Sequence, residues 1–338
     1  MSGGPHRAQG FTEAPEFKLL IIAVAVFALM AVLAPERFLS AQNMTSMAFQ
    51  FPEFAILALA MTITMMTGGI DLSVMGVANF SAVTGALILT TFADPGMGTG
   101  DSLMWLSVAL LASLAIGAAC GLINGTLVAH FGLPPILATL GSGLVFTGFA
   151  IAMTGGSAVM GFPDVVAWLG NEQLFGVPVP LILFVVLAVL LHILLTRTAF
   201  GLRVTMYGAN PLAALYAAVD INRMILKVYV IAGMFSSVAG MVIMSRANSA
   251  KADYGSSYLL LAVLIAVLGG VNPYGGYGRV IGVILAVLSM QFLSSGLNML
   301  QVSNFARELI WGVLLIFVMI INTHGIPGLK SLKATPSK

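Results

Sequence analysis

Asp71 is the residue whose type and surroundings most suggest chemistry, and we interpret it as the one acidic residue enclosed closely by apolar runs. A carboxylate at the centre of a bilayer costs about 2.5–3.5 kcal/mol on insertion scales. It must therefore lie near an interface, accept hydrogen bonds from nearby backbone, or serve a function. Asp71 and Ser73 open the apolar run 73–92, so Asp71 is suited to cap a helix from Leu72 onward. A structural cap and a direct role in a solute pathway both stay open, and the two can coexist.

Two glycine pairs follow apolar runs and resemble each other: Gly68-Gly69-Ile70-Asp71 and Gly269-Gly270-Val271-Asn272. Glycine frees the backbone to leave helical geometry, and repeated, glycine-interrupted hydrophobic segments are how many transporters build a pathway near the membrane midplane. Asn124 lies within another apolar run, where an amide either hydrogen-bonds a neighbouring helix or contacts solute. The predicted helix breaks and pathway residues are Gly68, Gly69, Asp71, Ser73, Asn124, Gly269, Gly270 and Asn272.

Other chemistries find little support in the residues. The stretch GGVNPYGGYG lacks the G-x-x-x-x-G-K-[ST] pattern of a phosphate-binding loop, and that pattern occurs nowhere in the chain. His130 and His192 have no Cys, Asp or Glu at ligand spacing, which argues against a metal site. No Ser/His/Asp or paired-carboxylate arrangement stands out. We therefore expect no catalytic residues, no metal and no cofactor.

The elements that must position these residues are membrane helices. Of 338 residues, 59% are hydrophobic and 8% are charged, against about 25% charged in a soluble domain. The composition predicts an all-α, polytopic transmembrane bundle of about ten helices, with eight to ten allowed. The predicted spans are the apolar runs 19–34, 48–66, 73–92, 103–129, 135–155, 179–196, 226–245, 257–270, 280–297 and 308–322. The shortest, 257–270, is a candidate broken or re-entrant element.

Lysine and arginine in short loops predict the orientation. Segments 93–102 and 155–175 contain neither residue and should lie outside, whereas the loop 197–227 and the tail 330–338 should lie inside. A ten-helix arrangement with both termini in the cytoplasm leaves four positive charges outside: Arg37, Arg246, Lys251 and Arg307. We predict a cytoplasmic tail over 1–17, a membrane domain over 18–325 and a second cytoplasmic tail over 326–338.

The loop 197–227 should contain a short helix. Asn210 is a good N-cap, Pro211 falls at the first helical position and Asp220 closes the run. Helical spacing gathers Leu212, Leu215, Tyr216 and Val219 on one face, and Ala213, Ala214, Ala217 and Ala218 fill most of the rest. About ten residues cannot form a stable helix alone, so the segment must dock. It packs either on its own membrane domain or, as a coupling helix, on a cytoplasmic ATPase.

Four stretches together resemble one family. TGGIDLSV (67–74), GLINGTLVAHFGLPPILATLGSG (121–143), GANPLAALYAAVDI (208–221) and LGGVNPYGGYGRVIG (268–282) are similar to the ribose/xylose/arabinose-type sugar permeases. These are the membrane subunits of bacterial ABC importers. The resemblance covers roughly residues 45–322, and the four motifs occur in the same order as in the family.

The resemblance implies an inner-membrane importer made of two permease subunits, identical or not, with ATPase domains and a periplasmic sugar-binding protein. It implies a coupling role for the predicted helix, with Gly208, Asn210, Pro211, Ala213, Ala214, Ala217 and Asp220 as the ATPase-contacting set. Partners are then protein subunits and membrane lipid, with no nucleic acid. ATP would be hydrolysed on a separate subunit, and the solute would be a neutral monosaccharide or related polyol.

One departure from the family pattern concerns the solute. Many such permeases carry acidic residues before the second glycine pair, whereas the segment 258–265 contains none. A furanosyl autoinducer, a sugar alcohol or a nucleoside therefore stays open as the solute. An ion-coupled secondary transporter is the alternative class. It should have an acidic or histidine relay within the membrane, for which we identify Asp71.

Overall fold

A computed structural model describes residues 15–93 and 96–324, so most of both predicted tails lies outside the described residues. Most of the described chain is helical. The helices are α1 (Pro15–Leu33), α2 (Pro35–Phe38), α3 (Ala41–Met65), α4 (Val74–Phe92), α5 (Thr99–Ala129), α6 (Pro135–Thr154), α7 (Asp164–Asn171), α8 (Val179–Arg197), α9 (Ala199–Ala209), α10 (Pro211–Tyr216), α11 (Ile221–Ala247), α12 (Tyr258–Leu268), α13 (Val280–Met299) and α14 (Asn304–His324).

The prediction of about ten apolar helices is confirmed. Within the described ranges, eight helices are long and apolar enough to cross a membrane: α1, α3, α4, α5, α6, α8, α11 and α13. The short apolar helix α12 and the 21-residue helix α14 account for the other two predicted runs. Each predicted run coincides with one helix, because apolar length rather than a local signal decides which residues fit the bilayer.

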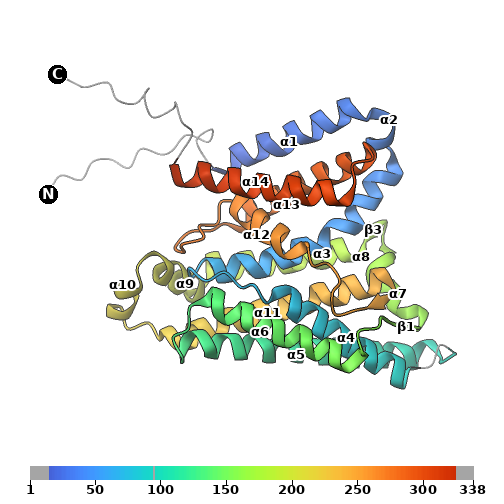
Figure 1. The fold of residues 1–338 in the computed structure, drawn as a ribbon, viewed down its shortest axis with the longest axis horizontal. Helices are drawn as coiled ribbons and strands as arrows, with labels where there is room; N and C mark the ends of the chain where they lie inside the picture. Colours follow the sequence, from blue (N-terminus) through green and yellow to red (C-terminus); the bar gives the residue numbers. More distant parts are fainter. Residues whose placement is uncertain (1–14, 94–95, 325–338) are drawn as a thin grey trace.

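The bundle has two distinct ends (Figure 1). The end that carries α9 and α10 also holds the first residues of α1 and the last residues of α14; we call it the α10 end. The opposite end, the α7 end, carries α2, α7 and the short strands. There β1 (Val159–Met160) pairs antiparallel with β4 (Ser249–Ala250), and β2 (Gln173–Leu174) pairs with β3 (Val177–Pro178).

Helix α3 forms the centre of the bundle. Every residue from Phe51 to Met65 is buried, and α8, α11, α12 and α13 pack around it. A helix that is hydrophobic on all sides needs such enclosure. Next to it, α5 and α11 approach closely through small residues: a Cβ placed on Gly117 would lie 2.4 Å from the Gly233 carbonyl oxygen. Membrane helices pack in this way because lipid supplies no hydrophobic drive to hold them together.

The segment that the sequence singles out as broken or re-entrant crosses the bundle with a short helix. Helix α12 has 11 residues and is therefore about 16 Å long, roughly half the thickness of a bilayer core. Before it, Ser249 and Ala250 pair with β1 at the α7 end. After it, the Gly276 amide donates to the Met66 carbonyl at the end of α3. Irregular chain on both sides of α12 thus completes the crossing.

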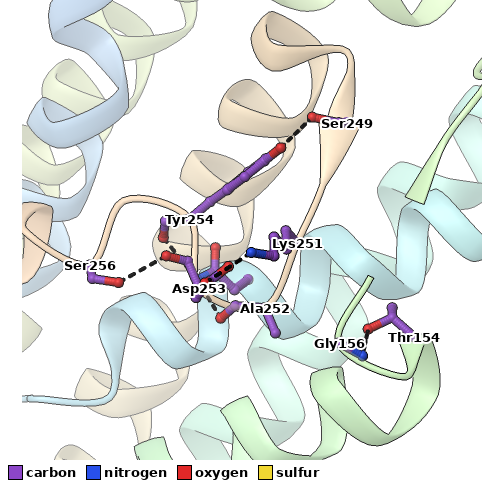
Figure 2. Close-up of polar contacts among 9 residues, drawn as sticks. Thr154, Gly156, Ser249, Lys251, Ala252, Asp253, Tyr254 and Ser256 are labelled. Atoms are coloured by element: carbon purple, nitrogen blue, oxygen red, sulfur yellow. Dashed lines mark hydrogen bonds and ion pairs between the residues drawn. The ribbon is translucent and has the colours of Figure 1, made fainter. Parts of the chain in front are cut away.

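Side-chain contacts fix the loop between β4 and α12 (Figure 2). The hydroxyls of Ser249 and Tyr254 lie 2.7 Å apart, Lys251 Nζ lies 3.1 Å from Asp253 Oδ2, and Ser256 donates to the Asp253 carbonyl at 2.8 Å. From α4, Asn79 Nδ2 donates to the carbonyls of Ala252 and Tyr254, both at 2.9 Å. Lys251, one of the positive charges predicted to lie outside, therefore has a local acidic partner.

Candidate coupling and translocation sites

Both predicted helix breaks are built by the same turn. At the end of α3, Gly68 has φ +81°, its amide donates to the Met65 carbonyl at 2.9 Å, and the Gly69 amide donates to Thr64 at 3.2 Å. At the end of α12, Gly270 has φ +83°, and the amides of Gly270 and Val271 donate to Val267 and Ala266, each at 3.0 Å. Each helix thus ends in a Schellman motif, whose left-handed residue favours glycine.

This geometry corrects the alignment of the two glycine pairs. By conformation, Gly68 corresponds to Gly270 rather than to Gly269, so the two breaks are offset by one residue from the letter-by-letter match. Gly269 has another role, because a Cβ there would lie 2.7 Å from the Cα of Val283. Glycine is therefore required once for its left-handed backbone and once for close helix packing.

Asp71 stabilises the first break. The side chain is 3% exposed, and Oδ1 accepts hydrogen bonds from the Ser73 amide at 2.9 Å and the Ser73 hydroxyl at 2.6 Å. The capping interpretation is correct in kind but displaced, because Ser73 rather than Asp71 occupies the N-cap position of α4. Asp71 caps the turn before the helix, and these hydrogen bonds compensate for its burial.

Asn124 links the first break to two helices. Its Nδ2 donates to the Ser73 hydroxyl at 2.7 Å, and its Oδ1 accepts from Ser142 of α6 at 2.5 Å. Thr139, also on α6, accepts from the Leu72 amide at 2.9 Å. Of the two interpretations of Asn124, interhelical hydrogen bonding is the one that these contacts support. The stretch 121–143 therefore holds the stretch 67–74 in place.

Glycine backbones from three segments meet at the α10 end. A Cβ on Gly208 of α9 would lie 2.0 Å from the Met66 carbonyl oxygen and 2.3 Å from the Gly276 nitrogen. A Cβ on Gly275 would lie 2.8 Å from the Gly68 nitrogen. We call Gly68, Gly208, Gly275 and Gly276 the glycine junction. It joins the loop 197–227 directly to both helix breaks, with no side chain between them.

Asn272 shapes one side of the junction, and Tyr207 precedes its member Gly208 in the chain. Asn272 Nδ2 donates to the Gly275 carbonyl at 2.8 Å, and its Oδ1 accepts from the Tyr274 amide at 3.1 Å. Asn272 therefore shapes the loop after α12. Tyr207 precedes Gly208 on α9 and is half-buried, and burial raises the pKa of its hydroxyl above the usual range. Tyr207 thus stays uncharged at neutral pH.

The predicted short helix exists as α10, but it has six residues rather than about ten. Asn210 is its N-cap, with Oδ1 accepting from the Ala213 amide at 3.1 Å, and Pro211 begins it. The helix ends early because Ala218 adopts φ +55° in a Schellman motif. Asp220 accepts from the Arg223 amide at 3.0 Å and so caps α11 instead of closing α10.

The faces of α10 also differ from the prediction. Ala214 is fully buried against its own chain, whereas Ala213 and Ala217 are exposed. The large residues Leu212, Leu215 and Tyr216 point outward, with Tyr216 88% exposed, and Val219 is half-buried. The exposed surface of α10 therefore carries the large apolar residues together with Ala213 and Ala217, and of the predicted alanine set only Ala214 is buried.

Sequence reasoning missed a second buried acid. Glu53 of α3 is 4% exposed, its Oε1 lies 2.5 Å from Arg246 Nε at the end of α11, and Tyr258 donates to its Oε2 at 3.0 Å. Asp71 is thus not the one enclosed acid. The available signal was a polar stripe on an apolar helix, formed by Gln42, Ser46, Gln50 and Glu53 at i, i+4, i+8 and i+11. A matching stripe on α13 comprises Gln291, Ser294, Ser295 and Asn298.

Known proteins are similar to this chain in sequence or in fold. Residues 43–319 match the family described as branched-chain amino acid transport system, permease component. The autoinducer 2 import system permease protein LsrD of Yersinia enterocolitica is 33% identical over 310 residues, which cover 89% of this chain and 88% of that protein. The protein of the same name from Enterobacter is 33% identical over 311 residues, covering 90% and 91% of the two chains.

Among solved structures, a metal-chelate type ABC transporter in an inward-facing conformation matches with a TM-score of 0.54. The match covers 91% of this chain and 99% of that chain at 16% identity. This likeness concerns the fold alone, since the two sequences differ at most positions.

Proposed function

The chain belongs to the branched-chain amino acid transport system permease family, as the permease component of an ABC importer, and on that premise we propose what it carries and how it is driven. The solute is a small, neutral, hydroxyl-rich molecule of the sugar type. The driving force comes from ATP hydrolysis on a separate subunit that docks on α10. Family membership sets aside the alternative of an ion-coupled secondary transporter.

The glycine junction carries the proposal for coupling. When the ATPase moves α10, it also moves α9, to which α10 is joined at Asn210. Gly208 of α9 lies against the chain just after α3 and the loop after α12, so a displacement reaches both breaks through backbone contact alone. The proposed coupling set keeps Gly208, Asn210, Pro211, Ala213, Ala217 and Asp220. We add Leu212, Leu215 and Tyr216 as the residues that dock on the ATPase, and Ala214 supports the helix from inside.

Two observations support a neutral, sugar-type solute. The relatives of high coverage are named as permeases for import of autoinducer 2, and the four motifs resemble sugar permeases. The buried Glu53 is matched by Arg246, so the polar stripe of α3 presents no net charge from this pair. A solute without charge crosses such a wall with the least electrostatic cost.

The assembly and its orientation follow from the same premise. Two permease subunits, of this chain or of this chain and a homologue, work with ATPase domains and a periplasmic binding protein in the bacterial inner membrane. The α10 end faces the cytoplasm, which places both termini there. The α7 end, with segments 93–102 and 155–175, faces the binding protein. The pathway residues Gly68, Gly69, Asp71, Ser73, Asn124, Gly269, Gly270 and Asn272 act at the breaks as positioning residues.

Co-purification tests the docking proposal. The ATPase encoded beside this permease should be retained by the wild-type chain in detergent and lost from Tyr216→Glu, because the substitution places a charge on the exposed apolar face of α10. Phe175→Glu is the matched control, since Phe175 is an aromatic side chain 96% exposed at the α7 end. Retention of the ATPase by Tyr216→Glu at the control level would refute docking on α10.

A further inference from the structure

A cavity lies where the polar stripes of α3 and α13 face α12 and α14. Its volume is about 370 Å³, within the range of pockets that hold small ligands. Gln50 and Phe54 of α3, Tyr258 of α12, Gln291 and Ser294 of α13, and Trp311 of α14 line it. We call this space the polar cavity. Its lining includes polar and charged side chains, whereas the side chains that fill the centre of the bundle are mostly apolar.

Two residues that line it, Gln291 and Trp311, each carry a buried hydrogen-bond donor that has no partner among the described residues. Gln291 is 2% exposed, and its Nε2 makes no hydrogen bond; the buried Nε1 of Trp311 makes none either. Buried donors normally find an acceptor, so a pair of unsatisfied donors on one cavity indicates that a ligand supplies it. The acceptor that would suit both is a hydroxyl or ring oxygen.

Charges around the cavity cancel. Arg246, which lines it, lies 2.5 Å from Glu53 behind the wall, and Tyr258 fixes the same carboxylate at 3.0 Å. Arg307 and Glu308 of α14 add one charge of each sign. The walls therefore offer fixed dipoles without net charge, which suits a neutral polar molecule better than an anion or a cation.

Aromatic surface completes the walls. Phe54 and Tyr258 stand edge to face with ring centroids 5.9 Å apart, and Trp311 lies on the opposing helix. Aromatic rings give apolar contact to the C–H faces of a sugar ring, while the polar groups meet its hydroxyls. The loop 249–256, held by its own contacts (Figure 2), fixes the start of α12 and with it Tyr258.

A second cavity, of about 470 Å³, leads from this one to the α7 end. The two share Gln50, Ser294 and Arg307 as lining residues, and the second continues past Ser46 and Asn298 to Ser40 beside α2. The polar stripes thus form a path from the α7 end to the polar cavity, and the glycine junction lies beyond its inner end.

We propose that the polar cavity binds one molecule of a neutral, hydroxyl-rich solute during transport, with Gln291 and Trp311 donating hydrogen bonds to its oxygens. The inference rests on the proposed function and adds the residues that recognise the solute within the membrane. Specificity is then set partly by the permease and not by the binding protein alone.

Uptake by the complete importer in vesicles tests the donors, with ribose and autoinducer 2 as probes. Gln291→Leu and Trp311→Phe should each raise the uptake KM about 3- to 10-fold, the effect of losing one hydrogen bond to an uncharged group. The controls are Ser289→Ala on the same helix, whose hydroxyl bonds its own backbone, and Trp168→Phe on α7. An analogue that lacks one hydroxyl should show a higher uptake KM than its parent in the wild type. This difference in KM should vanish in the variant that lacks the donor to that hydroxyl.

A labelling experiment covers the case in which those variants do not assemble. Cys120 is the one cysteine of the chain and is buried, so Ser294→Cys places a single accessible thiol in the cavity. Ribose or autoinducer 2 at saturating concentration should slow its reaction with a methanethiosulfonate reagent at least threefold, and should leave Ser157→Cys, at an exposed position after α6, unaffected.

The outcomes separate the two claims. The solute site alone would be overturned by three results in a complex that still binds its ATPase. These are a wild-type KM in the donor variants, unchanged discrimination between a sugar and its deoxy analogue, and a Ser294→Cys thiol that solute does not protect. Absence of ATPase binding and of ATP-driven uptake in the wild type would overturn the proposed function itself.

Discussion

Gly208 is a residue whose missing side chain has a direct mechanical consequence. The Gly276 amide donates a hydrogen bond directly to the Met66 carbonyl at 3.0 Å, and any Cβ at position 208 would enter the space of both groups. Gly208→Ala should therefore destabilise the protein by about 1–3 kcal/mol, as overpacking does, and strongly reduce ATP-driven uptake.

Gly148→Ala is the control for this prediction, because a Cβ on Gly148 of α6 meets no atom within 4 Å. Thermal unfolding in detergent and uptake in vesicles measure the two effects. Wild-type uptake by a correctly inserted Gly208→Ala protein would show that the junction does not transmit movement from α9.

At the scale of the element, the end of α10 depends on a residue poorly suited to its conformation. Ala218 occupies the left-handed position of a Schellman motif, where a side chain is unfavourable. Ala218→Gly should stabilise this helix end by about 0.5–1 kcal/mol. Hydrogen exchange of the α10 amides should become slower. Ala217→Gly, one residue earlier at φ −80°, should have the opposite sign because glycine only adds freedom there. Faster exchange in Ala218→Gly would contradict the assignment.

The pair of Glu53 and Arg246 joins α3 to α11. Arg246→Met leaves a buried carboxylate without its cation and should destabilise the fold by about 2–3 kcal/mol, less than for a fully enclosed pair because the arginine side chain is 29% exposed. The double variant Glu53→Gln/Arg246→Met should recover most of this loss.

The exposed pair of Lys251 and Asp253 provides the comparison. Lys251→Met should change stability by less than about 0.5 kcal/mol, since both side chains reach solvent. Thermal unfolding in detergent measures all three variants. Equal losses from Arg246→Met and Lys251→Met would show that burial adds nothing to the Glu53 pair.

At the scale of the whole molecule, orientation is the property to measure. Phe175→Cys at the α7 end should react with a membrane-impermeant thiol reagent in intact cells, whereas Tyr216→Cys on α10 should react only after the membrane is permeabilised. The wild-type chain gives the background, because its single thiol is buried. The reverse pattern would invert the assignment of the two ends.

The sequence predicts the fold well because membrane spans depend on summed hydropathy over about 20 residues. Each of the ten predicted runs became a helix, and the short run 257–270 was correctly singled out. The predictions that were wrong concern local backbone features. The length of α10 depends on one left-handed alanine, and the equivalence of Gly68 with Gly270 depends on which glycine adopts positive φ. Neither is visible in residue types alone.

The candidate site was predictable in its parts but not in its assembly. Asp71, Ser73 and Asn124 could be singled out as polar residues among apolar runs, yet their hydrogen bonds join positions 51 residues apart in the chain. The glycine junction is a contact between helix α9 and two loops that are distant in the chain, and it leaves no periodic pattern. Glu53 was overlooked because a single acid hardly lowers the hydropathy of a 25-residue helix, although the stripe to which it belongs has a clear helical period.

The glycine junction contains backbone and no side-chain recognition, whereas the polar cavity is built from side chains of α12, α13 and α14. Helices α3 and α12 reach both, since each lines the cavity and ends beside the junction. Under the two proposals, the residues that receive movement and the residues that contact the solute are therefore different sets. The cavity walls, and with them the solute, could then change while the coupling to ATP hydrolysis stays the same. The same division makes chimeras with exchanged α13 and α14 a practical route to importers of altered selectivity.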